Sequence, residues 1–144
     1  MKKFLLMLLF CSNVFAAGSA GLNFETYAGG GAYPSIYNRT LLSTGIVSSI
    51  NFNWGGGYVL NSGRADGVIV HFTGYINIAT SGLYYFGGNA DDGLIINVNN
   101  TSVVNSWIES GGSFRSGSIQ LTAGIVPIEV WYYENGCRSE RAHV

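Results

Sequence analysis

Apolar and polar residues alternate along the middle of the chain, which is the pattern of strands with one buried face. The longest such run covers residues 68 to 78, and the same period returns in LIINV (94 to 98) and VPIEVWYYE (126 to 134). Shorter runs predict three more strands, at LYYF (83 to 86), SVVNSWI (102 to 108) and GSIQLT (117 to 122). Strands at this spacing, with turns between them, are typical of a sandwich or barrel, so we predict an all-β antiparallel fold.

The pattern is weaker before residue 60, where only Leu22 with Phe24 and the run from Ile50 to Trp54 alternate. Gly, Ser and Thr residues around these runs predict loops, and ATSG (79 to 82) and GGNADDG (87 to 93) predict two more. Helix content should be small. Trp54 and Tyr132 are predicted core residues, whereas the pattern leaves Trp107 and Trp131 undecided between core and sugar-stacking roles.

The N-terminal segment reads as a secretory signal peptide over residues 1 to 16. Lys2 and Lys3 precede a short apolar run, FLLMLLF, and Val14 and Ala16 stand where a signal peptidase requires small residues. The run is too short for a bilayer of about 30 Å. A lipoprotein reading around Cys11 is weaker because bulky Phe10 precedes the cysteine. We therefore expect an exported chain, secreted or at the cell surface, with no transmembrane segment after processing.

Charge and cysteine content narrow the classes of function. Removing both lysines leaves five arginines against eight acids, a net charge of −3 (5 − 8), and the arginines are scattered, which argues against nucleic-acid binding. Cys137 is the one cysteine left after processing. A disulfide framework within the chain is therefore excluded, and the free thiol is a candidate for contact with another molecule. About 120 residues suffice for one domain, predicted at 17 to 136, followed by a polar tail at 137 to 144.

Two adjacent carboxylates, Asp91 and Asp92, precede the strand at residue 94. Neighbouring side chains of a regular strand point to opposite faces, so the pair could not grip one target from within a strand. An Asp-Asp-Gly sequence is also an ordinary loop signal. A glycosidase acid pair is disfavoured, because its members must flank a sugar at about 5 to 9.5 Å. His71 reads as a surface histidine, and no motif of a known catalytic class occurs, so we predict no enzyme activity.

The order of these elements resembles the PA-fourteen domain, named after the anthrax protective antigen. The resemblance runs from about Gly21 to Gly136 and rests on the succession of five segments, INFNWGGG (50 to 57), VIVHFTGYINIATSGLYYF (68 to 86), NADDGLIINVNNTSVVNSW (89 to 107), SIQLTAG (118 to 124) and PIEVWYYENG (127 to 136). It implies a single antiparallel β-sandwich.

The resemblance also implies a calcium site. In carbohydrate-binding members, the adjacent Asp pair is joined by a cis peptide bond and both carboxylates coordinate one Ca²⁺, which places Asp91 and Asp92 in that role. Because Ca²⁺ takes 6 to 8 oxygen ligands, further ligands are implied at the Asn135 side chain and at the backbone around Gly136 and Cys137. Tyr133 and Glu134 are the nearest candidates for ligand contact.

The function implied is Ca²⁺-dependent carbohydrate binding in adhesion, with glycans or glycoconjugates as partners. The alternative is a non-catalytic structural or protein-interaction module, in which the Asp pair serves only its loop. A piece of a larger adhesin or secreted glycosidase is a third reading. The ending CRSERAHV departs from the family pattern, since it lacks the apolar alternation of a last strand, and a missing strand would expose a sheet edge. The loops at 55 to 67 and 111 to 117 carry no readable code for a particular sugar.

Overall fold

The structure, a computed structural model, describes residues 4–7, 21–29 and 34–136. No helix occurs among these residues, and none is therefore long and apolar enough to cross a membrane. The described residues form ten strands: β1 (Phe4–Met7), β2 (Leu22–Ala28), β3 (Thr40–Val47), β4 (Asn51–Phe52), β5 (Val68–Ile78), β6 (Gly82–Ala90), β7 (Gly93–Val98), β8 (Thr101–Ser106), β9 (Ser113–Leu121) and β10 (Gly124–Glu134).

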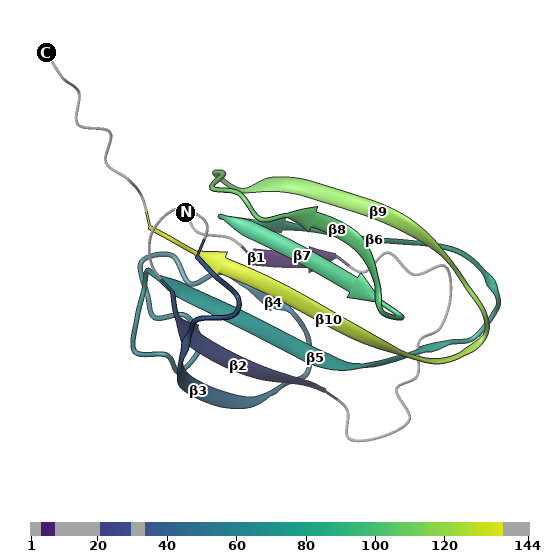
Figure 1. The fold of residues 1–144 in the computed structure, drawn as a ribbon, viewed down its shortest axis with the longest axis horizontal. Coiled ribbons are helices and arrows are strands. Elements are labelled where there is room, and N and C mark those ends of the chain that lie inside the picture. The colour runs from purple at the N-terminus through teal and green to yellow at the C-terminus, as the bar shows by residue number, and fades with distance from the viewer. Residues whose placement is uncertain (1–3, 8–20, 30–33, 137–144) are drawn as a thin grey trace, which may run out of the picture.

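The strands form two antiparallel sheets that pack face to face (Figure 1). The larger sheet has six strands in the order β3-β2-β5-β10-β7-β8, and the smaller has four in the order β4-β1-β6-β9. The chain crosses from the smaller to the larger sheet between β6 and β7, and crosses back between β8 and β9. The predicted all-β antiparallel fold is confirmed.

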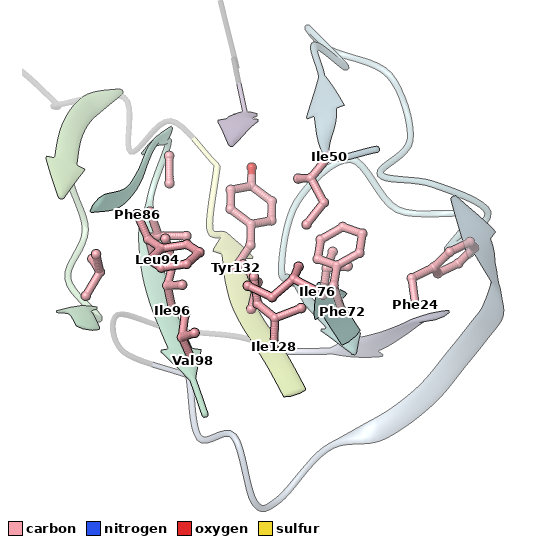
Figure 2. Close-up of a cluster of buried hydrophobic side chains, with 14 of the residues drawn as sticks. Phe24, Ile50, Phe72, Ile76, Phe86, Leu94, Ile96, Val98, Ile128 and Tyr132 are labelled. Atoms are coloured by element: carbon pink, nitrogen blue, oxygen red, sulfur yellow. The ribbon is translucent and has the colours of Figure 1, made fainter. Parts of the chain in front are cut away.

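The core lies between the two sheets and is built by the alternation seen in the sequence. Strand β10 lies between β5 and β7 in the larger sheet, and its whole length pairs with β5, from Gly124 opposite Ile78 to Glu134 opposite Val68. Its even-numbered side chains face the smaller sheet, as Figure 2 shows for Ile128 and Tyr132. Tyr132 is a core residue, as predicted, and Trp54 packs against the core while partly buried.

Three stretches predicted as loops are strands. Strand β3 was missed because it lies at the edge of the larger sheet, where its side chains are exposed or only half-buried and need no strict alternation. Residues 87 to 90 and 113 to 116 extend β6 and β9, which pair from Gly87 opposite Ser116 to Ala90 opposite Ser113. Glycine and serine dominate these ends, and such residues favour loops in a sequence-based reading even though the backbone pairs.

Strand β1 lies within the segment predicted as a signal peptide. Its backbone pairs with β6, Leu5 opposite Asn89, and with β4, Phe4 opposite Phe52. The signal peptide stays a prediction, and the expected cleavage after Ala16 lies outside the described residues, as does the predicted tail at 137 to 144. A chain processed after Ala16 would lack β1, which would leave this side of β6 without its partner.

Candidate functional site

The Asp91–Asp92 pair lies at the crossing from β6 to β7, at the end of the sandwich where β10 also ends. The peptide bond between the two residues is cis, as the resemblance implies. Gly93 then opens β7 directly opposite Tyr133. A Cβ atom on Gly93 would lie 2.2 Å from Cε1 of Tyr133, so only glycine fits this start of the strand.

The carboxylate of Asp92 connects three segments of the chain. Asp92 is 7% exposed, and its Oδ1 accepts a hydrogen bond from the backbone N–H of Ser110 at 3.1 Å, in the loop between β8 and β9. Its Oδ2 accepts from the N–H of Asn135, just past β10, at 2.9 Å. Its own N–H donates to the carbonyl of Tyr133 at 2.9 Å. One residue therefore holds the crossing, the 109–112 loop and the end of β10 together.

The electrostatic surroundings of Asp92 disfavour its ionised form. Burial is the largest cause of its raised pKa; the hydrogen bond from Asn135 opposes it, and the charge of Asp91 adds to it. Hydrogen bonding from Ser110 lowers the pKa again, and the charge of Glu109 raises it. The carboxylates of Asp91, Asp92 and Glu109 therefore repel one another at this end of the sandwich, and a bound cation would reduce that repulsion.

Arg115 on β9 supplies positive charge nearby. Its Nη1 donates to the carbonyl of Ala90 at 3.1 Å, and its Nη2 donates to Oγ of Ser110. Burial lowers the pKa of Arg115, and the charges of Asp92 and Asp91 oppose that effect. The guanidinium thus supports the two loops around the pair, while the described hydrogen bonds of Asp92 come from backbone N–H groups.

The segment after β10 is fixed by acidic side chains. Nδ2 of Asn135 donates to Oε1 of Glu109, which leaves the amide oxygen of Asn135 as an acceptor. The N–H of Gly136 donates to Oε1 of Glu134 at 2.7 Å. Gly136 has a φ of 83°, and a Cβ there would lie 2.9 Å from Cγ of Asp66. Cys137, the next predicted backbone ligand, lies outside the described residues.

Tyr133 and Glu134, predicted to contact ligand, are buried at 0% and 2% exposure. Tyr133 belongs to a second apolar cluster on the outer face of the larger sheet, where Trp107 packs edge-on against its ring at 4.5 Å between centroids. Glu134 faces inward, and its Oε2 accepts from the Tyr132 hydroxyl at 3.3 Å. That hydroxyl also donates to the main-chain oxygen of Asp91 at 2.7 Å. Both side chains support the end of β10 through these contacts, and the predicted contact of Tyr133 and Glu134 with a ligand stays a prediction.

The side chains around the Asp pair are of the ligand type that calcium prefers, but they are fewer than a complete coordination shell needs. Asp91, Asp92 and Asn135 offer oxygen atoms, the ligands that Ca²⁺ takes. Within the residues that the structure describes, no group of three or more His, Cys, Asp or Glu side chains is placed to hold a metal ion. A complete shell would therefore need backbone carbonyls or water, and the calcium site stays a prediction.

Glu109, Ser110, Arg115 and Asp66 were missed by sequence reasoning. They lie on loops or near strand ends without any spacing relation to the Asp pair; the crossing from β8 to β9 carries Glu109, Ser110 and Arg115 to this end, and the loop before β5 carries Asp66 next to Gly136. No local signal in the sequence could have identified them.

A second polar cluster lies on the outer face of the larger sheet. His71 on β5 lies between two carboxylates, with Nε2 2.7 Å from Glu129 on β10 and Nδ1 3.3 Å from Glu25 on β2. Its ring stacks on Trp131 at 3.7 Å between centroids. The side chain is 14% exposed, so His71 lies on the outer face, as predicted for a surface histidine, and is half-buried there between its partners. Trp131 is buried beneath the guanidinium of Arg39.

Comparisons with known proteins support the resemblance to the PA-fourteen domain. A family model described as the PA14 domain matches residues 21–141. Among solved structures, an anti-sigma factor domain-containing protein is 27% identical with a TM-score of 0.69, over 81% of this chain and 39% of that one. The chain thus spans about two fifths of that protein's length. No curated protein matches the sequence.

Two further structures share the fold at lower identity. A PA14 sugar-binding domain from an RTX adhesin is 22% identical with a TM-score of 0.62, over 83% of this chain and 85% of that one. A GH31 α-xylosidase from Xanthomonas citri is 15% identical with a TM-score of 0.61, over 81% of this chain and 12% of the enzyme. The fold therefore occurs both as a sugar-binding domain of an adhesin and as a small part of a glycosidase.

Proposed function

Because the chain belongs to the PA14 domain family, we propose that it is an exported, non-catalytic, Ca²⁺-dependent carbohydrate-binding module that serves adhesion. The observation that carries the proposal is the buried carboxylate of Asp92, which connects three segments of the chain beside a second carboxylate and an amide oxygen. The sugar-binding domain of the RTX adhesin, with the same fold, supports the glycan as ligand.

In the proposed site, Asp91, Asp92 and Asn135 hold the ion, and backbone atoms around Gly136 and Cys137 add ligands. Calcium supplies open coordination positions for vicinal hydroxyl groups of a sugar. The backbone N–H groups of Ser110 and Asn135 fix the Asp92 carboxylate. Glu109 fixes the amide of Asn135 through Nδ2, so that the amide oxygen is available. The chain thus orients its oxygen donors before a ligand arrives.

Thermal unfolding across free Ca²⁺ concentrations, with a chelator as zero point, tests the metal site. A ligand bound only by the folded state stabilises it by about 2.7 kcal/mol at a hundred times its dissociation constant. For a domain of this size, that is an increase in melting temperature on the order of 10 °C. The same titration with Mg²⁺ serves as control, because a smaller ion with strict octahedral demands fits such a shell poorly.

Retention on immobilised glycans tests the ligand. We expect binding that is lost in chelator and lost in Asp91→Ala. If that variant were retained as well as the native chain, the proposed mechanism would be wrong.

The second candidate function is a structural or protein-interaction module. It is favoured by the Asp92 hydrogen bonds themselves, which hold the loops without an ion. A cooperative unfolding transition indifferent to calcium, together with no glycan retention, would select this function.

A further inference from the structure

A hollow of about 290 Å³ lies on the outer face of the larger sheet, away from the Asp pair. It is lined by the β7–β8 hairpin and by the start of β10, through Asn97, Asn100, Ser102, Pro127, Ile128 and Glu129. Ile128 lies opposite Val98, whereas Tyr133 lies opposite Gly93. Five residues of strand separate the two positions, which is about 17 Å. The hollow is thus a separate place on the molecule.

The carboxylate in this hollow is held in position from two sides. Oε2 of Glu129 accepts a hydrogen bond from Nδ2 of Asn97 at 2.8 Å, and Oε1 lies 2.7 Å from Nε2 of His71. A carboxylate offers about four lone-pair sites, so Glu129 keeps acceptor capacity for a ligand. Burial is the largest single influence and raises the pKa of Glu129, but hydrogen bonds from Asn97 and His71, the charge of His71 and a hydrogen bond from Trp131 together lower it. Glu129 therefore stands in the hollow as an oriented, charged acceptor.

The remaining walls combine fixed polar groups with apolar faces. The hairpin turn is anchored to β10 through the N–H of Asn99, which donates to the carbonyl of Pro127 at 2.9 Å. Asn100 and Ser102 add an amide and a hydroxyl to the same hollow. Tyr75 lies directly opposite Pro127 on β5 and is 69% exposed. Cβ atoms at opposite positions are about 5 Å apart, so the exposed Tyr75 side chain starts next to Pro127, on the side of β10 away from the β7–β8 hairpin.

We propose that this hollow is a calcium-independent subsite for a single uncharged or amine-bearing sugar ring. Its volume corresponds to about ten water molecules and stands at the lower end of ligand pockets, which suits one ring and not an oligosaccharide. The hydroxyl groups of a sugar donate to the Glu129 carboxylate and exchange hydrogen bonds with the amides of Asn97 and Asn100. The C–H face of the ring packs on Pro127 and on the Tyr75 side chain next to it. An acidic sugar is repelled by the fixed carboxylate.

Backbone amide NMR of the full chain in a chelator tests the proposal, because the chelator silences the calcium site. The probes are the methyl glycosides of glucose, galactose and mannose, and glucosamine, each titrated to about 50 mM, far above a millimolar dissociation constant. We expect at least one probe to shift the amides of residues 97 to 102 and 127 to 129 in a saturable way. Glu129→Gln should weaken that probe about tenfold or more, since a hydrogen bond to a charged acceptor is lost.

Glu25→Gln is the matched control. Glu25 faces the other nitrogen of the same His71, but it lies outside the hollow, so a loss that comes only from disturbing the histidine would appear equally in both variants. Tyr75→Ala offers a second test at an exposed position, with Tyr85→Ala on the smaller sheet as its control, because Tyr85 is 57% exposed. We expect Tyr75→Ala to weaken binding and Tyr85→Ala to leave it unchanged.

Three results would overturn the proposal: no saturable shift with any of the four probes, shifts confined to the Asp91–Asp92 end, or equal weakening by Glu25→Gln and Glu129→Gln. Because every titration contains chelator, a failure here leaves the calcium-dependent function untouched, and a failure of that function leaves this subsite untouched.

Discussion

The two aspartates at the sheet crossing should respond differently to alanine, although both are proposed to hold calcium. In the calcium-free protein, Asp92→Ala removes the acceptor for two backbone donors, the N–H groups of Ser110 and Asn135. Each buried donor left without a partner costs about 1–3 kcal/mol. The substitution also removes a carboxylate whose burial is unfavourable, which offsets part of that cost. We expect a net destabilisation of about 2 kcal/mol.

Asp91→Ala should leave the calcium-free protein nearly unchanged. Within the described part of the chain, no group donates a hydrogen bond to the Asp91 carboxylate. The bond that this residue does accept, from the Tyr132 hydroxyl, goes to its main-chain oxygen, which alanine retains. Substitutions of this kind usually stay within about 0.5 kcal/mol.

Urea unfolding of the two variants and the native chain, in chelator and again in saturating calcium, measures these differences. We expect the free energy of unfolding of Asp92→Ala to be lower than that of the native chain in both solutions. Asp91→Ala should have the same free energy of unfolding as the native chain in chelator, but calcium should raise it only a little. Equal destabilisation of both variants in chelator would refute the assignment of the loop-holding role to Asp92 alone. An undiminished calcium gain in Asp91→Ala would refute its role as a ligand.

Two further predictions concern packing and pH. Gly93→Ala should destabilise the fold by about 1–3 kcal/mol, because its Cβ would overlap the buried ring of Tyr133. Gly82→Ala is the control and should leave the stability unchanged, because no atom lies within 4 Å of a Cβ at that position. Thermal unfolding of the two variants and the native chain measures the difference. The pKa of Glu25 is lowered chiefly by a tyrosine hydroxyl, and hydrogen bonds lower that of Glu129 despite burial. Their stabilisation is therefore complete above the unfolded value of 4.5 and is lost as pH falls through the folded pKa. Unfolding measured from about pH 6 to pH 3 should show a shallower loss in a Glu25→Gln, Glu129→Gln double variant, and an equally steep loss would contradict the role of these two groups.

The sequence allowed the strands with one core face to be predicted, because burial imposes the two-residue period there. Strand β5 is an example, found at the same bounds in sequence and structure. Strand β3 escaped because an edge strand with half-exposed faces is free of that constraint. The Asp pair could be identified through the family resemblance. The network around it could not, because Ser110 and Glu109 reach the pair only through the crossing from β8 to β9. Contacts made by crossings depend on how whole sheets pack, which no short window of sequence encodes.

The position of Asp92 has a mechanical consequence. Its backbone and side chain connect the crossing of β6 to β7, the loop that leads into β9, and the end of β10. Two of these three hydrogen bonds tie Asp92 to the end of β10, which neighbours β7 in the larger sheet, and the bond from Ser110 ties it to the loop that enters the smaller sheet. A force that pulls the loop before β9 away from this end is therefore passed through Asp92 to both β7 and β10.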